Sequence, residues 1–435
     1  MRVAFSAPEY QADGSFASVG YEFEGSTEGG WTIRRNGTPH LELGEGYRLL
    51  QTQSCGVCST DLARQFLPFP LPQITGHEVL ATDESGGRFV VEINASHLAR
   101  GLKTDCPFCN GGLHTHCPER IVLGIHDLPG GFGPYVLAPV DAIISLPEVI
   151  PDSAGVLVEP LAAAINAVEM VDPEAGETVA VLGPRRLGML VVAALGAWRE
   201  SRGIDFEVLA LARHQHLREL GLEVGATNAL TVDDAVPDGV ADVVIDTTGN
   251  PAALEVAVRL AKREVHLKST HGQPSAGLCH TTELVVDELK IGRLEGEPKG
   301  QVIDMGEAPP AELFAQVSGL RADFAVAENA AQVDAAIRPS VEHQLSIVKP
   351  RGEILIRPDV KSDSVLLREI SNRGLRLSSS RCGDFRKAIQ LLEANEKLRG
   401  IGEKLITQSF GNGDMNSVFA TARSPECIKA VVEIS

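Results

Sequence analysis

The stretch that decides the fold is "ETVAVLGPRRLGMLVVAALGAWRES", residues 177–201. A short apolar run that ends at a glycine predicts a buried strand, and the apolar residues at helical spacing after Gly188 predict a helix. The same alternation continues downstream, with strands predicted at 205–212, 240–249 and 264–270 and helices through 217–222 and over 250–262. Alternating strands and helices form right-handed βαβ units, so this part of the chain is predicted to be a doubly wound, parallel α/β sheet.

The sequence before this stretch has a different texture. Over about the first 150 residues, short apolar runs such as "FVVEI" (89–93) and "YVLAPVDAIISLP" (135–147) alternate with Gly and Pro turns. This pattern predicts a strand-rich antiparallel domain. The expected organisation is a first domain, a nucleotide-binding domain and a return to the first domain, at residues 1–158, 159–395 and 396–435.

Residues 292–377 look like an insertion into the second domain. "ADFAVAENAAQVDAAI" (322–337) echoes "ADVVIDTTGNPAALEVAV" (241–258), and "PRGEILIRPD" (350–359) echoes the strand near Lys268. A partial internal duplication would explain both echoes and would add βα elements to the sheet. The alternative, that any two βα segments look alike at this level, stays open.

Composition excludes several classes of function. The 435 residues contain 39 basic and 58 acidic side chains, a net charge of −19, which argues against nucleic acid or an anionic membrane as partner. The chain has no apolar run of transmembrane length, and its first residues, "MRVAFSAPEY", lack the pattern of a signal peptide. We therefore expect a globular protein of the cytoplasm.

The cysteines point to metal. Five of the eight fall between residues 55 and 117, and clustering of this kind without a secretion signal favours metal binding over disulfides. "QSCGVCSTDL" (53–62), "GHEV" (76–79) and "LVEPLA" (157–162) together offer thiolate, imidazole and carboxylate groups. That donor set suits a zinc ion that keeps one position for water or substrate.

"GVCSTD", "GHE", "VEP" and the later strand–glycine–helix, in this order, resemble the zinc-dependent medium-chain dehydrogenase/reductase (alcohol dehydrogenase) family, and within it the polyol, glucose and threonine dehydrogenase branch. The resemblance implies a GroES-like antiparallel catalytic domain and a Rossmann nucleotide-binding domain with an insertion. It implies these catalytic and zinc-site residues: Cys58, His77, Glu78 and Glu159 at the metal, Thr60 as proton acceptor and Asp61 behind the histidine. Cys55 would be a buried thiol, and Ala63 occupies the position of a frequent relay histidine.

A second cluster lies in "KTDCPFCNGGLHTHC" (103–117). Cys106, Cys109 and Cys117 match the last three ligands of the family's four-cysteine structural zinc lobe, whereas Lys103 stands at the first. Tetrahedral zinc needs a fourth ligand. Asp105, His114 and His116 are nearby candidates, and three outcomes stay open: zinc with a substitute ligand, zinc with water, or an empty lobe.

The cofactor motif departs from its usual form. G-x-G-x-x-G would need glycines at 183, 185 and 188, and residue 185 is arginine. Ala212 stands where an acidic residue binds the ribose of NAD, and Arg213 follows it, which favours NADP(H) over NAD(H). The predicted cofactor-binding residues are Gly183, Arg185, Arg186, Leu187, Gly188, Arg213, His214, Thr248 and Gly249.

The resemblance implies a homo-oligomeric, zinc-dependent oxidoreductase. It would transfer a hydride between a secondary alcohol, polyol or sugar-like substrate and NADP(H) or NAD(H). Two alternatives stay open. The departures at Ala63, Lys103 and Arg185 and the long insertion allow a dehydrogenase-derived binding or scaffold protein. The other alternative is an enzyme of the same fold that retains its nucleotide for a different reaction, such as epimerisation.

Overall fold

The computed structural model describes residues 1–67, 69–232, 236–268, 272–306, 308–317, 319–339, 346–411 and 414–434. The chain divides into two compact units, one made of residues 1–162 and 384–435 and the other of residues 163–383. Among the described residues, no helix combines the length and apolar character needed to cross a membrane.

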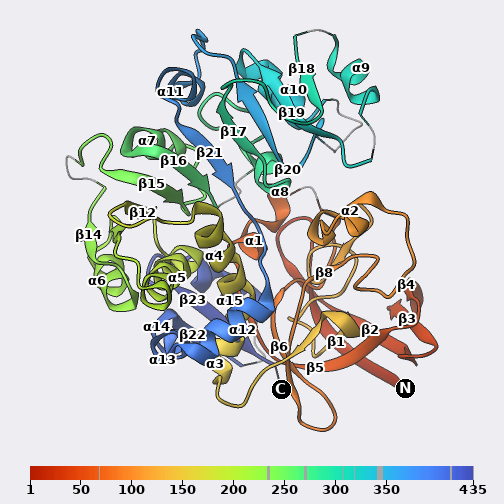
Figure 1. Ribbon diagram of the computed structural model, residues 1–435. Coiled ribbons are helices and arrows are strands. Elements are labelled where there is room, and N and C mark those ends of the chain that lie inside the picture. Colours follow the sequence, from red (N-terminus) through yellow and green to blue (C-terminus); the bar gives the residue numbers. More distant parts are fainter. Residues whose placement is uncertain are drawn as a thin grey trace. The chain divides into compact units, whose positions relative to one another are not determined.

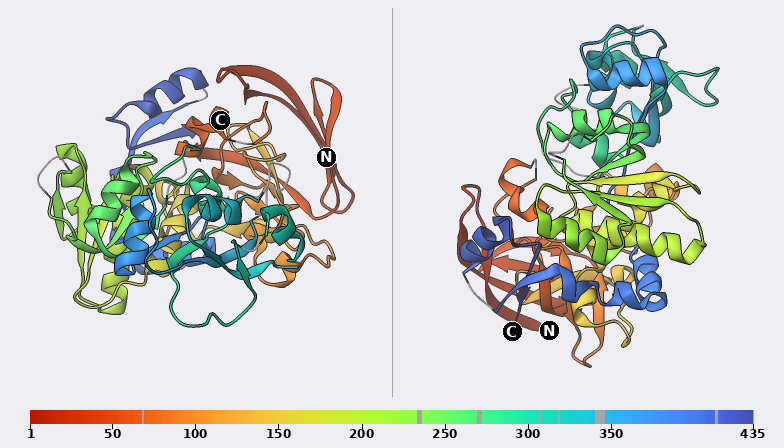
Figure 2. Two further views of the ribbon diagram at one scale, coloured as in Figure 1. Left: turned by 90° about the horizontal axis from the view of Figure 1, so that it is seen from above. Right: turned by 90° about the vertical axis from the view of Figure 1, so that its left-hand side faces the viewer.

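The first unit contains two main sheets whose strand pairs are antiparallel, except for the parallel pair β22/β23. The N-terminal sheet is a four-stranded meander, visible as a long curved ribbon in Figure 2, and its strands follow chain order: β1 (Arg2–Tyr10), β2 (Phe16–Ser26), β3 (Gly30–Arg35) and β4 (Thr38–Leu43). The side that packs inward carries large apolar residues such as Phe23, Trp31 and Ile33, which are buried. Alternation of buried and exposed positions along β2 fits a sheet with one covered face.

The second sheet of this unit contains Glu78 of the predicted metal site, and Cys58 and His77 lie just outside the ends of two of its strands. Its strands run in the order β11-β7-β6-β5-β23-β22, with β10 also paired to β5. Their bounds are β5 (Tyr47–Gly56), β6 (Glu78–Thr82), β7 (Arg88–Val91), β10 (Tyr135–Pro139), β11 (Ile143–Ser145), β22 (Ile406–Phe410) and β23 (Lys429–Glu433). The C-terminal strand β23 therefore shares a sheet with strands from residues 47–145, and β5 lies between β6 and β23.

The second unit is built on a ten-stranded sheet (Figure 1). Its first six strands are parallel, in the order β14-β13-β12-β15-β16-β21. They are β12 (Thr178–Leu182), β13 (Glu207–Leu211), β14 (Asn228–Leu230), β15 (Ala241–Asp246), β16 (Ala261–Leu267) and β21 (Arg376–Ser379). The predicted fold class is confirmed: an antiparallel domain is combined with a doubly wound Rossmann sheet.

The connecting helices are α5 (Arg186–Arg202), α6 (Gln215–Val224) and α7 (Ala253–Leu260). The helix predicted over 250–262 ends earlier than expected, because Ala261 and Lys262 already belong to β16. There Ala261 pairs with Ala241 of the neighbouring strand, so hydrogen bonding between strands overrides the local helical pattern.

Four further strands extend the sheet beyond β21, in the order β17-β20-β19-β18. They are β17 (Lys290–Arg293), β18 (Val302–Asp304), β19 (Ala322–Ala327) and β20 (Val348–Ile356), accompanied by α9 (Pro310–Ala315) and α10 (Ala330–Ile337). The strand β17 pairs antiparallel with β21, and every other pair in the extension is parallel.

The two halves of this sheet match each other across the β17/β21 pair. The segments that echo each other in sequence form β15 with α7 on one side and β19 with α10 on the other. The two halves also exchange one strand each. The strand β17 follows β16 in the chain, through α8 (Thr281–Val286), but pairs with β20. The strand β21 follows β20, through α11 (Val365–Arg373), but pairs with β16.

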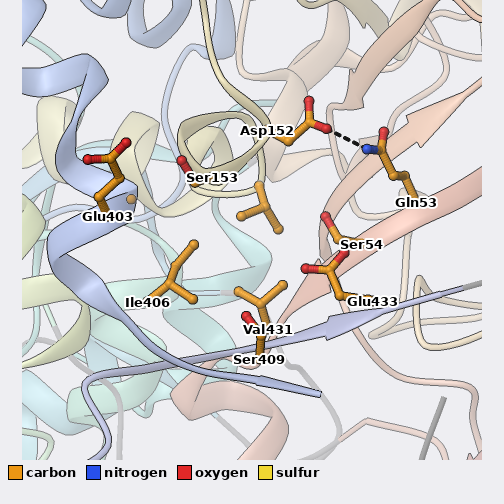
Figure 3. A pocket seen from close by; sticks show the side chains of 11 residues that line it. Gln53, Ser54, Asp152, Ser153, Glu403, Ile406, Ser409, Val431 and Glu433 are labelled. Atoms are coloured by element: carbon orange, nitrogen blue, oxygen red, sulfur yellow. Dashed lines mark hydrogen bonds between the residues drawn. The ribbon is translucent and has the colours of Figure 1, made fainter. Parts of the chain in front are cut away.

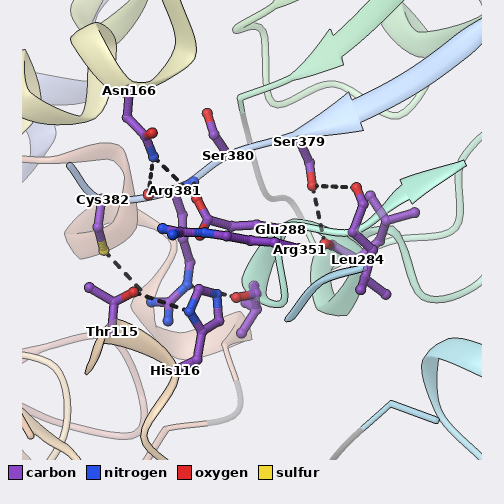
Figure 4. A network of polar contacts seen from close by, with 12 residues as sticks. Thr115, His116, Asn166, Leu284, Glu288, Arg351, Ser379, Ser380, Arg381 and Cys382 are labelled. Atoms are coloured by element: carbon purple, nitrogen blue, oxygen red, sulfur yellow. Dashed lines mark hydrogen bonds and ion pairs between the residues drawn. The ribbon is translucent and has the colours of Figure 1, made fainter. Parts of the chain in front are cut away.

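A buried carboxylate joins the ends of the inserted segment to the rest of the second unit (Figure 4). Glu288 accepts hydrogen bonds from Asn166 Nδ2 (3.1 Å) and from the backbone N–H of Arg381 (3.0 Å). Arg351 Nε donates a further hydrogen bond to Glu288, at 2.9 Å. Glu288 and Arg381 are thus adjacent in space although the insertion separates them in the sequence.

Candidate active site and metal centres

Three ligand-type side chains from two separate segments converge in the first unit. Cys58 caps the short helix α1 (Ser59–Leu62), His77 precedes β6, and Glu78 is the first residue of β6. One ligand atom from each lies within 4.8 Å of the other two. His77 and Glu78 are buried and Cys58 is half-buried, so the structure brings the predicted thiol, imidazole and carboxylate together.

Asp61 holds these two segments in place. Its carboxylate accepts hydrogen bonds from the backbone N–H of Cys58 (2.8 Å) and of Gly76 (3.2 Å). The same carboxylate lies 3.5 Å from His77 Nδ1, which leaves Nε2 as the ring nitrogen for a metal. Burial opposes the charged form of His77, but the negative charges of Asp61 and Cys58 outweigh it and raise the pKa of the imidazole well above its usual value.

Lys429 is absent from the residues predicted for this site, but the structure places its side chain there. Its ammonium group forms an ion pair with Glu78 and donates to the carbonyl of Val57 at 3.2 Å. Lys429 is only 4% exposed, which is rare for lysine unless the charge is paired. A lysine at the start of an otherwise apolar strand, "KAVVEI", is the sequence signal that points to such a pairing.

The other predicted residues lie at varying distances from the trio. Thr60 Oγ1 is 3.7 Å from Cys58 Sγ. Glu159, in the first turn of α4 (Val158–Val171), does not join the 4.8 Å group of Cys58, His77 and Glu78. Burial raises the pKa of Glu159 to about 7, against the opposing influence of His77.

The trio fits a zinc ion. Thiolate, imidazole and carboxylate are all zinc ligands, and three protein ligands leave a coordination position for substrate. Apart from the ion pair with Lys429, neither oxygen of the buried Glu78 carboxylate has a hydrogen-bond partner among the described residues. A buried carboxylate in that state is one that a bound cation would stabilise.

The second cluster is also assembled, with an unexpected fourth member. Ligand atoms of His97, Cys106, Cys109 and Cys117 lie within 4.8 Å of one another. This group does not include the fourth-ligand candidates predicted from the sequence, Asp105, His114 and His116. His97 was missed because it lies upstream of the cysteine-rich stretch, where the spacing gave no reason to include it.

The predicted cofactor residues lie at the carboxyl ends of the strands in the second unit. The ends of β12, β13 and β15 are in register, since Leu182 is paired with both Leu211 and Asp246. Gly183 has φ +70°, and a Cβ there would lie 2.4 Å from Thr248 Cγ2; a Cβ at Gly188 would lie 2.4 Å from Thr247 Oγ1. Both glycines are therefore required by close packing.

The remaining cofactor candidates occupy the same edge. Arg185 is the N-cap residue of α5, and Arg186 and Leu187 begin its first turn. Arg213 and His214 are exposed between β13 and α6, where His214 is the N-cap residue. Thr248 donates from its backbone N–H and its hydroxyl to Asp246 Oδ1, at 2.9 and 2.7 Å, and Gly249 follows with φ +65°. In a parallel sheet this edge is where dinucleotides bind.

A pocket of about 410 Å³ lies elsewhere in the first unit (Figure 3). Its lining includes Gln53, Asp152, Glu403 and Glu433, and none of the predicted site residues contributes to it. Two of its lining residues are joined by a hydrogen bond, from Gln53 Nε2 to Asp152 Oδ2 at 2.5 Å.

Comparison with known proteins agrees with the motifs and the fold. A sequence profile of the alcohol dehydrogenase GroES-like domain matches residues 44–148. L-galactonate-5-dehydrogenase of Escherichia coli (strain K12) is 28% identical over 285 residues, 59% of this chain and 82% of that protein. L-threonine 3-dehydrogenase of Bacillus subtilis (strain 168) is 26% identical over 284 residues, 59% of this chain and 78% of that protein.

Among solved structures, a zinc-binding dehydrogenase of Sinorhizobium meliloti 1021 bound to NADP superposes with a TM-score of 0.59. It covers 99% of both chains at 20% identity, so this likeness concerns the fold. The ordered motifs, the matching domain profile, the sequence relatives and the shared fold lead to one conclusion. The chain is similar to the zinc-dependent medium-chain dehydrogenase/reductase family: it contains an alcohol dehydrogenase GroES-like domain, and its sequence relatives include sugar-acid and threonine dehydrogenases.

Proposed function

We propose that this protein is a zinc-dependent oxidoreductase that transfers a hydride between a hydroxyl-rich secondary alcohol and NADP(H). The observation that carries the proposal is the convergence of Cys58, His77 and Glu78 within 4.8 Å in a buried site. A zinc ion held there would act as a Lewis acid that lowers the pKa of the substrate hydroxyl.

The chain's own residues would orient the ligands and move the proton. Asp61 fixes the Cys58 backbone and faces the His77 ring, as carboxylates behind metal-bound histidines generally do. Thr60, beside Cys58, is the hydroxyl that would accept the substrate proton. With Ala63 in place of the relay histidine, the proton would leave Thr60 through water.

The substrate class follows from the polarity around the trio. Besides Glu78, a second carboxylate, Glu159, is close enough for its pKa to respond to His77 and Lys429. Carboxylates make a metal site harder and more polar than additional thiolates would, which suits polyols and sugar-like substrates. The names of the sequence relatives, a galactonate and a threonine dehydrogenase, support polar secondary alcohols.

The preference for NADP(H) rests on the end of β13. Ala212 is buried and offers no carboxylate to a ribose, while Arg213 is exposed beside it. A guanidinium at this position suits a 2′-phosphate. Arg185 and Arg186, at the start of α5, would add positive charge near the pyrophosphate.

The deciding experiment assays purified, zinc-replete protein against a panel of polyols, sugar acids and hydroxy amino acids with NADP⁺ and with NAD⁺. Turnover of a secondary alcohol, faster with NADP⁺, is the expected result. Bound zinc without nucleotide binding would instead support a scaffold protein. Nucleotide that survives purification without net oxidation of any alcohol would support the third class of function, an internal redox reaction such as epimerisation.

A further inference from the structure

The segment that contains the second cluster has little regular structure of its own. Its base is a two-residue pairing, β8 (Asn94–Ala95) with β9 (Ile121–Val122). Within it, α2 (Pro107–Asn110) and η2 (His114–His116) contain only four and three residues. A segment of this kind, without a core of its own, is one that a metal ion can stabilise directly.

The distances within the cluster suit a tetrahedral ion. His97 Nδ1 lies 3.2 Å from Cys117 Sγ and 3.6 Å from Cys109 Sγ, and Cys106 completes the group. Zinc–sulfur and zinc–nitrogen bonds of about 2.3 and 2.0 Å separate neighbouring ligand atoms by about 3.5 to 3.8 Å. The four atoms therefore need only small shifts to share one ion.

The other side of the His97 ring sets its tautomer. His97 Nε2 lies 3.1 Å from a carboxylate oxygen of Glu119. An ionised carboxylate only accepts hydrogen bonds, so Nε2 carries the hydrogen and the lone pair of Nδ1 faces the sulfurs. Carboxylates orient metal-ligating histidines in this way.

We propose that this lobe binds a structural zinc ion through three cysteines and His97, with Glu119 as the residue that positions the histidine. In this assignment the fourth ligand is His97, near the start of the lobe. Residue 103, where the family has its first cysteine, is an exposed lysine. The assignment does not depend on the proposed dehydrogenase activity, because this ion would take no part in hydride transfer.

The test measures zinc content in full-length protein carrying Cys58→Ser, which empties the reactive site so that the remaining zinc reports on the lobe. About one zinc per chain is expected. Adding His97→Ala should remove nearly all of it, while His114→Ala, an exposed histidine in the same lobe, should leave it unchanged. Absence of zinc from the Cys58→Ser protein, or its retention after His97→Ala, would overturn the assignment.

A second pair of variants separates ligation from folding of the lobe. His97→Cys should retain the ion, and in the cobalt-substituted protein it should intensify the sulfur-to-metal charge-transfer bands as a fourth thiolate joins. Glu119→Leu should weaken metal affinity by about 10- to 100-fold, whereas Glu119→Gln, which still accepts a hydrogen bond, should weaken it less. A cobalt spectrum that is identical for wild-type and His97→Cys protein would show that His97 is not a ligand.

Discussion

Lys429 and Glu78 form a buried ion pair that crosses strand β5 at Gly56. Because β6 and β23 flank β5, the two side chains meet above the residue between them. A Cβ on Gly56 would lie 2.0 Å from Glu78 Oε2 and 3.1 Å from Lys429 Cε. The absence of a side chain at residue 56 is therefore what allows Glu78, a predicted metal ligand, to pair with a lysine near the C-terminal end of the chain.

Replacing Gly56 by alanine should break this ion pair. Disruption of a buried pair costs about 3–5 kcal/mol, and the displaced Glu78 should also lower the zinc affinity of the reactive site. Urea unfolding and zinc analysis would measure both effects. Gly44→Ala is the control, since a Cβ there meets nothing within 4 Å. Equal stability of the two variants would contradict the prediction.

Lys429→Met tests whether the lysine compensates the charge of Glu78. Without zinc, the free energy of unfolding of the variant should be lower by about 3–5 kcal/mol, because a buried carboxylate is left without a cation. Bound zinc should recover part of that loss, so the melting temperature should respond to zinc more strongly in the variant than in the wild type. The double variant Lys429→Met/Glu78→Gln removes both charges and should regain stability without metal. An equal zinc response in wild type and Lys429→Met would count against the prediction.

The sequence predicted the Rossmann sheet because its strands and helices are local features. Strand–glycine–helix order and apolar spacing place β12, β13 and β15 without any knowledge of distant contacts. The exchange of β17 and β21 could not be foreseen in this way. Which strand occupies the place next to β16 is decided by pairing between segments about a hundred residues apart, and both candidates follow a short helix.

The same limit applies to the candidate sites. Cys58, His77 and Glu78 were identified because their types and order resemble a known ligand set. His97 was missed because nothing in its local sequence demands a partner. Lys429 was missed because its place in an apolar strand calls for a buried partner but does not say which residue that partner is. Their importance depends on which atoms the fold brings within a few ångströms, and spacing along the chain does not encode that.

Cys58 and Cys55 should respond differently to replacement by serine. Cys55 is fully buried and stays outside the ligand trio. Burial, reinforced by the charges of Asp61 and Glu78, raises the pKa of its thiol well above the usual value, so it stays protonated and is a poor ligand. Cys58→Ser should remove the reactive-site zinc, and Cys55→Ser should retain it. Equal zinc loss in metal analysis would show that the ligand is misassigned.

Arg213→Ala should change cofactor preference. If the guanidinium binds the 2′-phosphate, its loss should weaken the affinity for NADPH by about 10- to 100-fold, the contribution of a charge-assisted hydrogen bond. The affinity for NADH should stay nearly unchanged. Fluorescence titration with both nucleotides measures the ratio. Arg202→Ala, at the far end of α5, is the control. A ratio that does not change would contradict the NADP(H) assignment.

His266 should make the second unit less stable in acid. Its Nδ1 lies 2.7 Å from Ser378, whose hydroxyl donates to Glu264, so Nδ1 carries the ring hydrogen. Burial, with smaller contributions from Lys268 and Lys290, lowers the pKa of His266 to about 3.

Between pH 6.5 and 3 the unfolded chain therefore binds a proton at His266 that the folded chain does not bind. The free energy of unfolding should fall by up to about 1.4 kcal/mol per pH unit as pH decreases. His266→Asn should flatten this slope. Urea unfolding followed by Trp198 fluorescence in a Trp31→Phe background measures it, and parallel slopes for variant and wild type would refute the assignment.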